Sequence, residues 1–178
     1  MKFPVAARRG GMRWVMRWVL AVGAPFVAPI FAQNSLAPPG EQKPILTVQG
    51  DGVQIYACKD AGSGAQWTLV APDAKLLDAS GKVVGTHGAG PFWKSVDGSL
   101  VQGQVVAKNS APGAGDVAWL LLKASAHEGK GLMSTVEYIR RTETHGGAAP
   151  ATGCDGQHLN AELRVPYTAT YTFYSARN

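Results

Sequence analysis

Short runs of alternating apolar and polar residues make up most of the chain from residue 44 onward. Alternation with a period of two places the apolar side chains on one face of a β-strand. A continuously apolar run, such as residues 117–123, is typical of a strand buried on both faces. We therefore predict strands over residues 45–49, 53–58, 67–71, 76–77, 83–84, 92–96, 99–107, 117–123, 133–141 and 165–174.

Turn residues separate these runs. Gly50-Asp51-Gly52 lies between the first two runs, Pro72-Asp73 ends the third, and Asp78-Ala79-Ser80-Gly81 is a cluster typical of a turn. Asp97-Gly98, with a run on each side, is the strongest indication of a hairpin. The pattern predicts strands joined by tight turns.

No segment shows apolar residues at helical spacing with caps at both ends, and only residues 155–163 could form a short helical turn. About eight or nine short strands at regular spacing predict an all-β domain, either a β-sandwich or a partly closed β-barrel. Because strand order is not encoded in the pattern, both architectures stay open.

The first 32 residues are typical of a secretory signal peptide. Basic residues up to Arg17 precede an uncharged apolar run over residues 18–32. This run is shorter than the roughly 20 residues that cross a bilayer, and Pro25 and Pro29 interrupt it. We expect residues 1–32 to be a signal peptide, residues 33–43 a flexible linker and residues 44–178 a single β domain, with no membrane span after processing.

Charge outside this leader is balanced. The chain has 17 basic and 12 acidic residues. Lys2, Arg8, Arg9, Arg13 and Arg17 all precede residue 33, whereas no acidic residue does, so the net charge from Gln33 onward is zero. A neutral domain lacks the basic surface that binds nucleic acid. We expect a periplasmic or secreted domain without a nucleic-acid partner.

Two cysteines, Cys58 and Cys154, are far apart in the sequence. An even number of cysteines in an oxidising compartment favours a disulfide. Their spacing does not match a C-x-x-C redox or zinc motif, so we predict a structural bridge between them.

Residues 85–99 (GTHGAGPFWKSVDGS) are the strongest candidate for a functional segment. Three glycines surround His87, and Trp93 and Asp97 follow. One interpretation is a loop that presents an imidazole and an indole to a ligand, with Asp97 as a further polar contact. The other is a tight glycine-rich connection, with His87 hydrogen-bonded to the backbone and Trp93 in the core. We retain His87, Trp93 and Asp97 as candidate ligand-binding residues.

Other chemistry has little support in the sequence. The histidines lack the short spacing of zinc ligands, although His87, His145 and His158 could converge in space. There is no G-x-S-x-G nucleophile motif and no phosphate-binding glycine loop. We expect no metal and no cofactor.

Several runs together resemble one family, the secreted "domain of unknown function 3455" proteins of bacteria and fungi. They are GVQIYAC (residues 52–58), WTLVAP (67–72), GTHGAGPFWKSVDGS (85–99), WLLLK (119–123), GGAAPATGC (146–154) and VPYTATYTFY (165–174). The resemblance implies an exported β domain and no established activity.

Three functions are consistent with these observations. We favour an exported, non-enzymatic β domain that binds a small molecule, a glycan or an envelope partner. The alternatives are a hydrolytic or metal-assisted enzyme that uses residues 85–97, and a purely structural, disulfide-bridged module.

Overall fold

The strands of the chain follow one another around a single antiparallel sheet. The computed structural model describes Met1 and residues 36–177, so the expected signal peptide beyond Met1 and the start of the expected linker lie outside the described residues. The elements are β1 (Gln42–Asp60), β2 (Ala65–Leu77), β3 (Val83–Gly88), β4 (Phe92–Ser95), β5 (Leu100–Asn109), β6 (Trp119–Glu128), the 3-10 helix η1 (Leu132–Thr135), β7 (Tyr138–Gly146) and β8 (Glu162–Ala176). The prediction of an all-β fold is confirmed.

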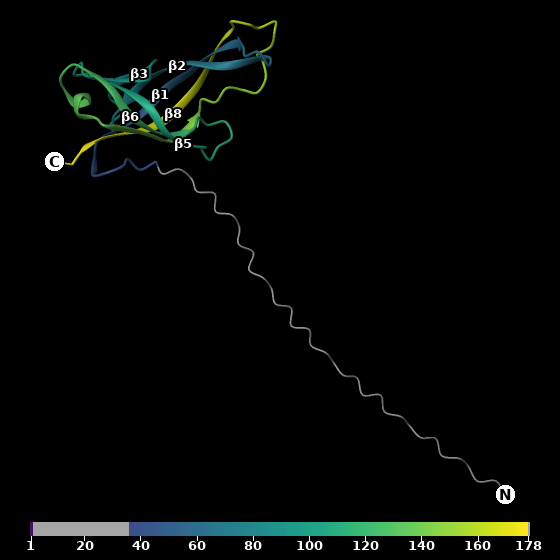
Figure 1. Cartoon of the computed structure of the whole chain (residues 1–178), viewed down its shortest axis with the longest axis horizontal. Coiled ribbons are helices and arrows are strands. Elements are labelled where there is room, and N and C mark those ends of the chain that lie inside the picture. Colours follow the sequence, from purple (N-terminus) through teal and green to yellow (C-terminus); the bar gives the residue numbers. More distant parts are fainter. Residues whose placement is uncertain (2–35, 178) are drawn as a thin grey trace. The chain divides into compact units, whose positions relative to one another are not determined.

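The sheet closes because β8 returns to pair with β1. This pairing runs from Gln42 opposite Ala176 to Ala57 opposite Glu162, and Figure 1 shows the two long strands side by side. Every other strand pairs with its neighbours in sequence. The eight strands fall within the predicted eight to nine. β1 begins at Gln42, inside the segment expected to be a linker.

The predicted break at Gly50-Asp51-Gly52 is wrong, because β1 continues through it. These glycines permit close contact between neighbouring parts of the sheet. A Cβ atom on Gly50 would lie 2.6 Å from the Tyr171 ring, and one on Gly52 would lie 2.1 Å from the carbonyl oxygen of Asp73. A side chain at either position would therefore force the neighbouring elements apart.

β2 likewise continues through the predicted break at Pro72. Pro72 pairs with Gln54 of β1, but β2 pairs with β3 only from Ala74 to Leu77. The proline thus lies where β2 has a strand on one side only. An edge-like position of this kind tolerates a residue that lacks a backbone N–H.

The predicted strand over residues 133–141 is correct only in its second half. η1 occupies the first half, with Met133 and Val136 buried in the core. The carboxylate of Asp97 accepts a hydrogen bond from the backbone N–H of Leu132, and the hydroxyl of Ser99 accepts one from that of Met133. These contacts, made by residues far away in sequence, fix the helical turn. The possible helix at 155–163 is also wrong, because turns occupy this segment up to β8.

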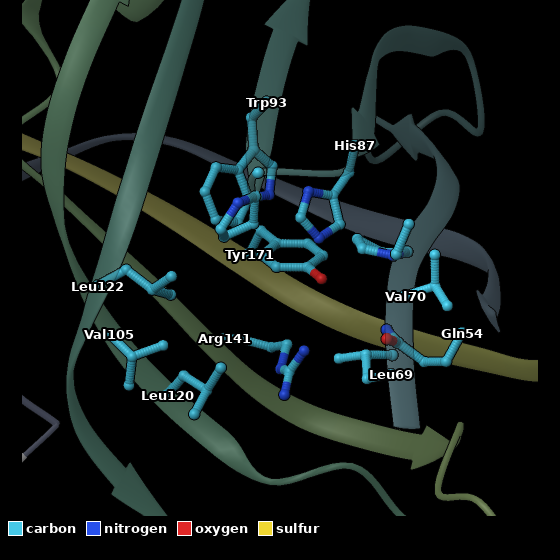
Figure 2. Close-up of a pocket in the computed structure, with 14 residues that line it drawn as sticks. Gln54, Leu69, Val70, His87, Trp93, Val105, Leu120, Leu122, Arg141 and Tyr171 are labelled. Carbon is cyan, nitrogen blue, oxygen red and sulfur yellow. The ribbon is translucent and has the colours of Figure 1, made fainter. Parts of the chain in front are cut away.

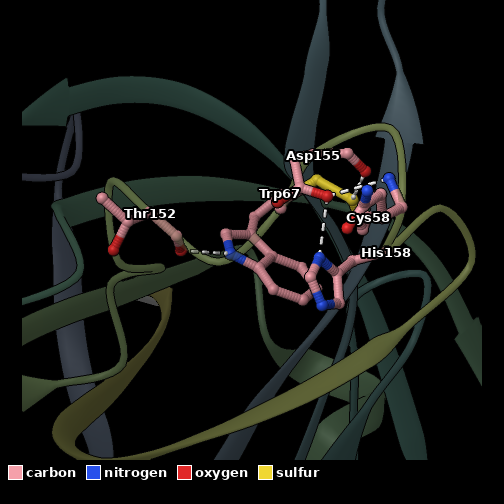
Figure 3. Close-up of a disulfide and its surroundings, with 7 residues drawn as sticks. Cys58, Trp67, Thr152, Asp155 and His158 are labelled. Carbon is pink, nitrogen blue, oxygen red and sulfur yellow. Dashed lines mark hydrogen bonds and ion pairs between the residues drawn. A yellow bond between two sulfur atoms is a disulfide. The ribbon is translucent and has the colours of Figure 1, made fainter.

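The predicted disulfide between Cys58 and Cys154 is confirmed, with Cα atoms 5.3 Å apart. It joins the end of β1 to the loop between β7 and β8 (Figure 3). The indole N–H of Trp67 donates to the carbonyl of Thr152 at 3.0 Å, which attaches the same loop to β2. The loop is thus held at one end of the sheet.

The core lies inside the closed sheet and contains aromatic and branched side chains from nearly every element. Its buried members are Val48, Ala74, Leu76, Trp93, Val101, Leu122, Met133, Val136, Ile139, Tyr167, Ala169, Tyr171 and Phe173. Within residues 36–177, no helix has the length and the apolar composition that a membrane span requires.

The short strands β3 and β4 leave part of the wall uncovered. β4 pairs with β5 only between residues 92–94 and 100–102. Consequently residues 69–72 of β2 and Val105 of β5 line opposite sides of a cavity without a strand between them (Figure 2). The turn between β3 and β4 borders the cavity through Gly90 and Pro91.

Candidate functional site

The main candidate site is a cavity of about 360 Å³ within the sheet. Its walls are largely apolar, and a few polar side chains point into it (Figure 2). The lining residues are Gln54, Leu69, Val70, Ala71, Pro72, His87, Gly90, Pro91, Trp93, Val105, Leu120, Leu122, Arg141 and Tyr171.

Apolar side chains surround the opening. Leu69, Val70 and Val105 are exposed on its two sides. Two bulges occur here, because Val70 has no register partner in β1 and Val106 has none in β6. Bulges bend a strand and change the direction of its side chains, so the sheet is irregular where the cavity opens.

Three aromatic rings form the inner wall. His87 and Trp93 are register partners on β3 and β4, and their rings stack with centroids 4.4 Å apart and planes 9° apart. The ring of Tyr171, from β8, makes an edge-type contact with each of them, with ring centroids 5.2 and 5.7 Å apart. Both residues therefore lie on strands, and Trp93 belongs to the core, as the second interpretation of this segment expected. His87 is only 4% exposed and Trp93 1%.

Burial and one hydrogen bond define the state of His87. Its Nδ1 lies 2.7 Å from the carbonyl oxygen of Phe92, and since a carbonyl can only accept, Nδ1 carries the hydrogen. Burial lowers the pKa of His87 to about 4, although the Phe92 contact opposes the shift, and the charge of Arg141 adds to it. The imidazole is therefore neutral at pH 7, and its Nε2 is an acceptor.

Arg141 is the one charged side chain of the lining. It lies on β7 two residues after the buried Ile139, so both side chains point to the inside. Its Nε and Nη2 donate to the carbonyl of Ala118 at 3.0 and 2.8 Å. None of the ion pairs found in the described part of the chain includes Arg141. Burial raises the pKa of Tyr171, and the charge of Arg141, together with side-chain hydrogen bonds with Tyr167 and Arg141, opposes this shift.

Two buried N–H donors in the lining, besides those of Arg141, have no hydrogen-bond partner in the described part of the chain. Gln54 Nε2 and Trp93 Nε1 are buried and have no hydrogen-bond acceptor among residues 36–177. The Tyr171 hydroxyl shares a contact of 3.2 Å with that of Tyr167. Buried polar groups without partners are uncommon in folded proteins. The two that belong to this lining could donate to acceptor atoms of a bound molecule.

Asp97, the third candidate, is not part of the lining. It occupies the turn between β4 and β5, where its carboxylate accepts from the hydroxyl and backbone N–H of Ser99 and from the N–H of Leu132. These contacts, with the Ser99 hydroxyl first, lower the pKa of Asp97 to about 2. The structure thus brings His87 and Trp93 together and uses Asp97 to fix a turn.

The remaining histidines do not join His87. His145 is exposed on β7 and does not line the cavity. His158 pairs with Asp155 at 2.7 Å beside the disulfide (Figure 3), and His127 Nε2 lies 2.7 Å from the carbonyl of Val136. Over the described residues, no three side chains among His, Cys, Asp and Glu are grouped as metal ligands.

Sequence reasoning missed Gln54, Arg141 and Tyr171. One indication of Arg141 was available, since a charged residue two positions after Ile139 in an alternating run belongs to the apolar face. Nothing in the sequence connected it with His87, because β7 and β3 are not adjacent in the sheet.

Comparison with known proteins identifies one relationship. The model of a family described as "Protein of unknown function (DUF3455)" matches residues 38–175. Neither the curated proteins nor the solved structures gave a match.

Proposed function

The chain belongs to the DUF3455 family of proteins of unknown function, and we propose that its β domain binds a small, largely apolar molecule in the cavity lined by His87, Trp93 and Arg141. The observation that carries the proposal is this cavity of about 360 Å³, which combines apolar walls with a few inward polar groups. Ligand sites in proteins typically have this composition, and eight-stranded barrels can hold one small ligand.

The lining favours a small apolar molecule over a glycan, because a sugar would require more polar partners than these walls offer. It also favours binding over acid–base catalysis. A general base works best when its pKa lies near the working pH, and burial lowers the pKa of His87 to about 4.

A series of 1-alkanols from hexanol to dodecanol tests the proposal by titration calorimetry. Each added methylene should contribute about 0.8 kcal/mol, or about fourfold in affinity, until the cavity is full. Absence of saturable binding across the series would contradict the proposed function.

Two valine variants show whether the alkanols occupy this cavity. Val105→Trp should fill the opening and weaken binding at least tenfold. Val96→Trp is the matched control, because Val96 is also exposed but does not line the cavity. Equal affinities of the two variants would place the alkanols elsewhere.

The proposal includes export. A basic segment, a short apolar run and Ala32 support removal of the leader, and a disulfide is typical of a periplasmic or extracellular protein. Mass spectrometry of the exported protein should find an N-terminus within a few residues of Gln33. An intact Met1 in the membrane fraction would contradict processing.

A further inference from the structure

We propose that the ligand of this cavity is an amphipathic monocarboxylate, whose carboxylate binds the Arg141 guanidinium while its apolar chain lies against the cavity walls. The inference rests on the proposed function and adds the chemical class of the ligand.

The first argument is the charge of the cavity. Arg141 is the only charged residue among its lining residues, and no carboxylate of the described chain pairs with it. A partly buried charge is costly unless it is paired. A ligand carboxylate would supply the missing partner, whereas a cationic ligand would be repelled.

The second argument is the orientation of the guanidinium. Its Nε and Nη2 both donate to the carbonyl of Ala118, which fixes the plane of the group. The Tyr171 hydroxyl is a second hydrogen-bond partner of the guanidinium. The N–H groups outside the Ala118 contact are two on Nη1 and one on Nη2. One on each nitrogen points in the same direction, and this fork matches the two oxygens of a carboxylate. Because the group is held before binding, little side-chain entropy is lost on binding.

The third argument is the composition of the rest of the lining. Figure 2 shows the guanidinium of Arg141 between the apolar side chains of Leu69 and Leu120. A carboxylate bound there would have apolar surface on both sides. The ligand that fits is therefore charged at one end and apolar over the remainder.

Cavity volume limits the length of the apolar chain. One water molecule, which has a single non-hydrogen atom, occupies about 30 Å³ in the liquid. At this volume for each atom, the cavity of about 360 Å³ holds about a dozen non-hydrogen atoms. Decanoate is a carboxylate of about this size.

The test compares decanoate, 1-decanol and decylamine by titration calorimetry on the protein without its leader. The three probes share one chain and differ in the charge of the head group. Decanoate should bind at least tenfold more tightly than decanol, and decylamine more weakly than decanol. Equal affinity for decanoate and decanol would overturn this inference and leave the proposed function intact. No binding of any probe would overturn both.

Two variants locate the effect. Arg141→Gln should abolish the preference for decanoate over decanol. Arg140→Gln is the matched control, because it removes the same charge from the neighbouring position, where the guanidinium lies 5.5 Å from the Tyr174 ring centre. It should retain the preference for decanoate. Loss of the preference in both variants would show a general charge effect and overturn the assignment to Arg141. If Arg141→Gln does not fold, the wild-type comparison of the three probes still decides the inference.

Discussion

His87 combines three properties that depend on one another: burial, stacking on Trp93 and a hydrogen bond from Nδ1 to the Phe92 carbonyl. Protonation would place a charge in this apolar environment. The folded protein therefore resists protonation of His87 more strongly than the unfolded chain does, and this difference connects its stability to pH.

His87 should make the domain less stable in mild acid. Its pKa is about 4 in the folded state against an ordinary 6.5, so the unfolded state binds more protons between these values. The contribution of neutral His87 to the free energy of unfolding is complete above pH 6.5. It decreases as the pH falls toward 4, where about 3 kcal/mol of stability has been lost. Denaturant unfolding of the wild type and of His87→Gln at several pH values measures this contribution as the difference between their free energies of unfolding.

Asp97 provides the control for this experiment, because it titrates in a different range. Its pKa is lowered from 3.8 to about 2, so its contribution is present above pH 3.8 and is lost as the pH falls toward 2. Asp97→Asn should therefore change the profile only below about pH 4. If His87→Gln keeps the wild-type slope between pH 4 and 6.5, the assignment to His87 is wrong.

At the scale of the element, the packing of β1 against its neighbours requires glycine at two positions. Gly50 and Gly52 were expected to form a turn, but they lie inside a strand where neighbouring groups approach closely. The contact at Gly52 involves backbone atoms of Asp73 and Ala74, which cannot move without shifting β2.

Gly52→Ala should therefore destabilise the domain by about 3 kcal/mol, the upper part of the range for overpacking. Gly156→Ala is the matched control, because nothing lies within 4 Å of a Cβ atom at that position. Thermal or denaturant unfolding of the two variants gives the comparison. A Gly52→Ala protein as stable as the Gly156→Ala control would mean that β1 and β2 can separate at little cost.

The elements also show which parts of the fold a sequence can predict. The turn at residues 78–81 was predicted correctly from local chemistry, since the Asp78 carboxylate accepts from the N–H groups of Ser80 and Lys82. Errors arose where distant residues decide the conformation. Alternation at Met133 predicted a strand, but hydrogen bonds from η1 to Asp97 and Ser99 produce a helical turn.

The candidate site divides in the same way. His87 and Trp93 were found because they lie close together in one unusual segment. Arg141 and Gln54 joined them only through closure of the sheet, since they come from β7 and β1. Closure depends on strand order, and local periodicity contains no information about it.

For the whole molecule, the disulfide is the only covalent connection between distant parts of the described chain. Its cysteines are 96 residues apart. Closing a loop of this size lowers the entropy of the unfolded chain, which stabilises the folded state by up to about 4–5 kcal/mol. The Cys58→Ser/Cys154→Ser double variant should be less stable by at most this amount in denaturant unfolding. Labelling of the unfolded, unreduced wild type should detect no free thiol. A reactive thiol there would contradict the bridge.

The pairing of β1 with β8 brings the two ends of the sheet together, and the backbone N–H of Arg177 donates to the carbonyl of Glu41. Every other pair of neighbouring strands is consecutive in the sequence. Only the pairing of β1 with β8 must close a loop of nearly the whole domain, and closing a long loop is a slow step in folding. The finished ring, however, does not depend on where the chain is cut. A circular permutant that joined residue 177 to residue 41 and began in the turn after Asp78 would convert the slowest pairing into a local hairpin. The same cavity would then be built by a different order of assembly.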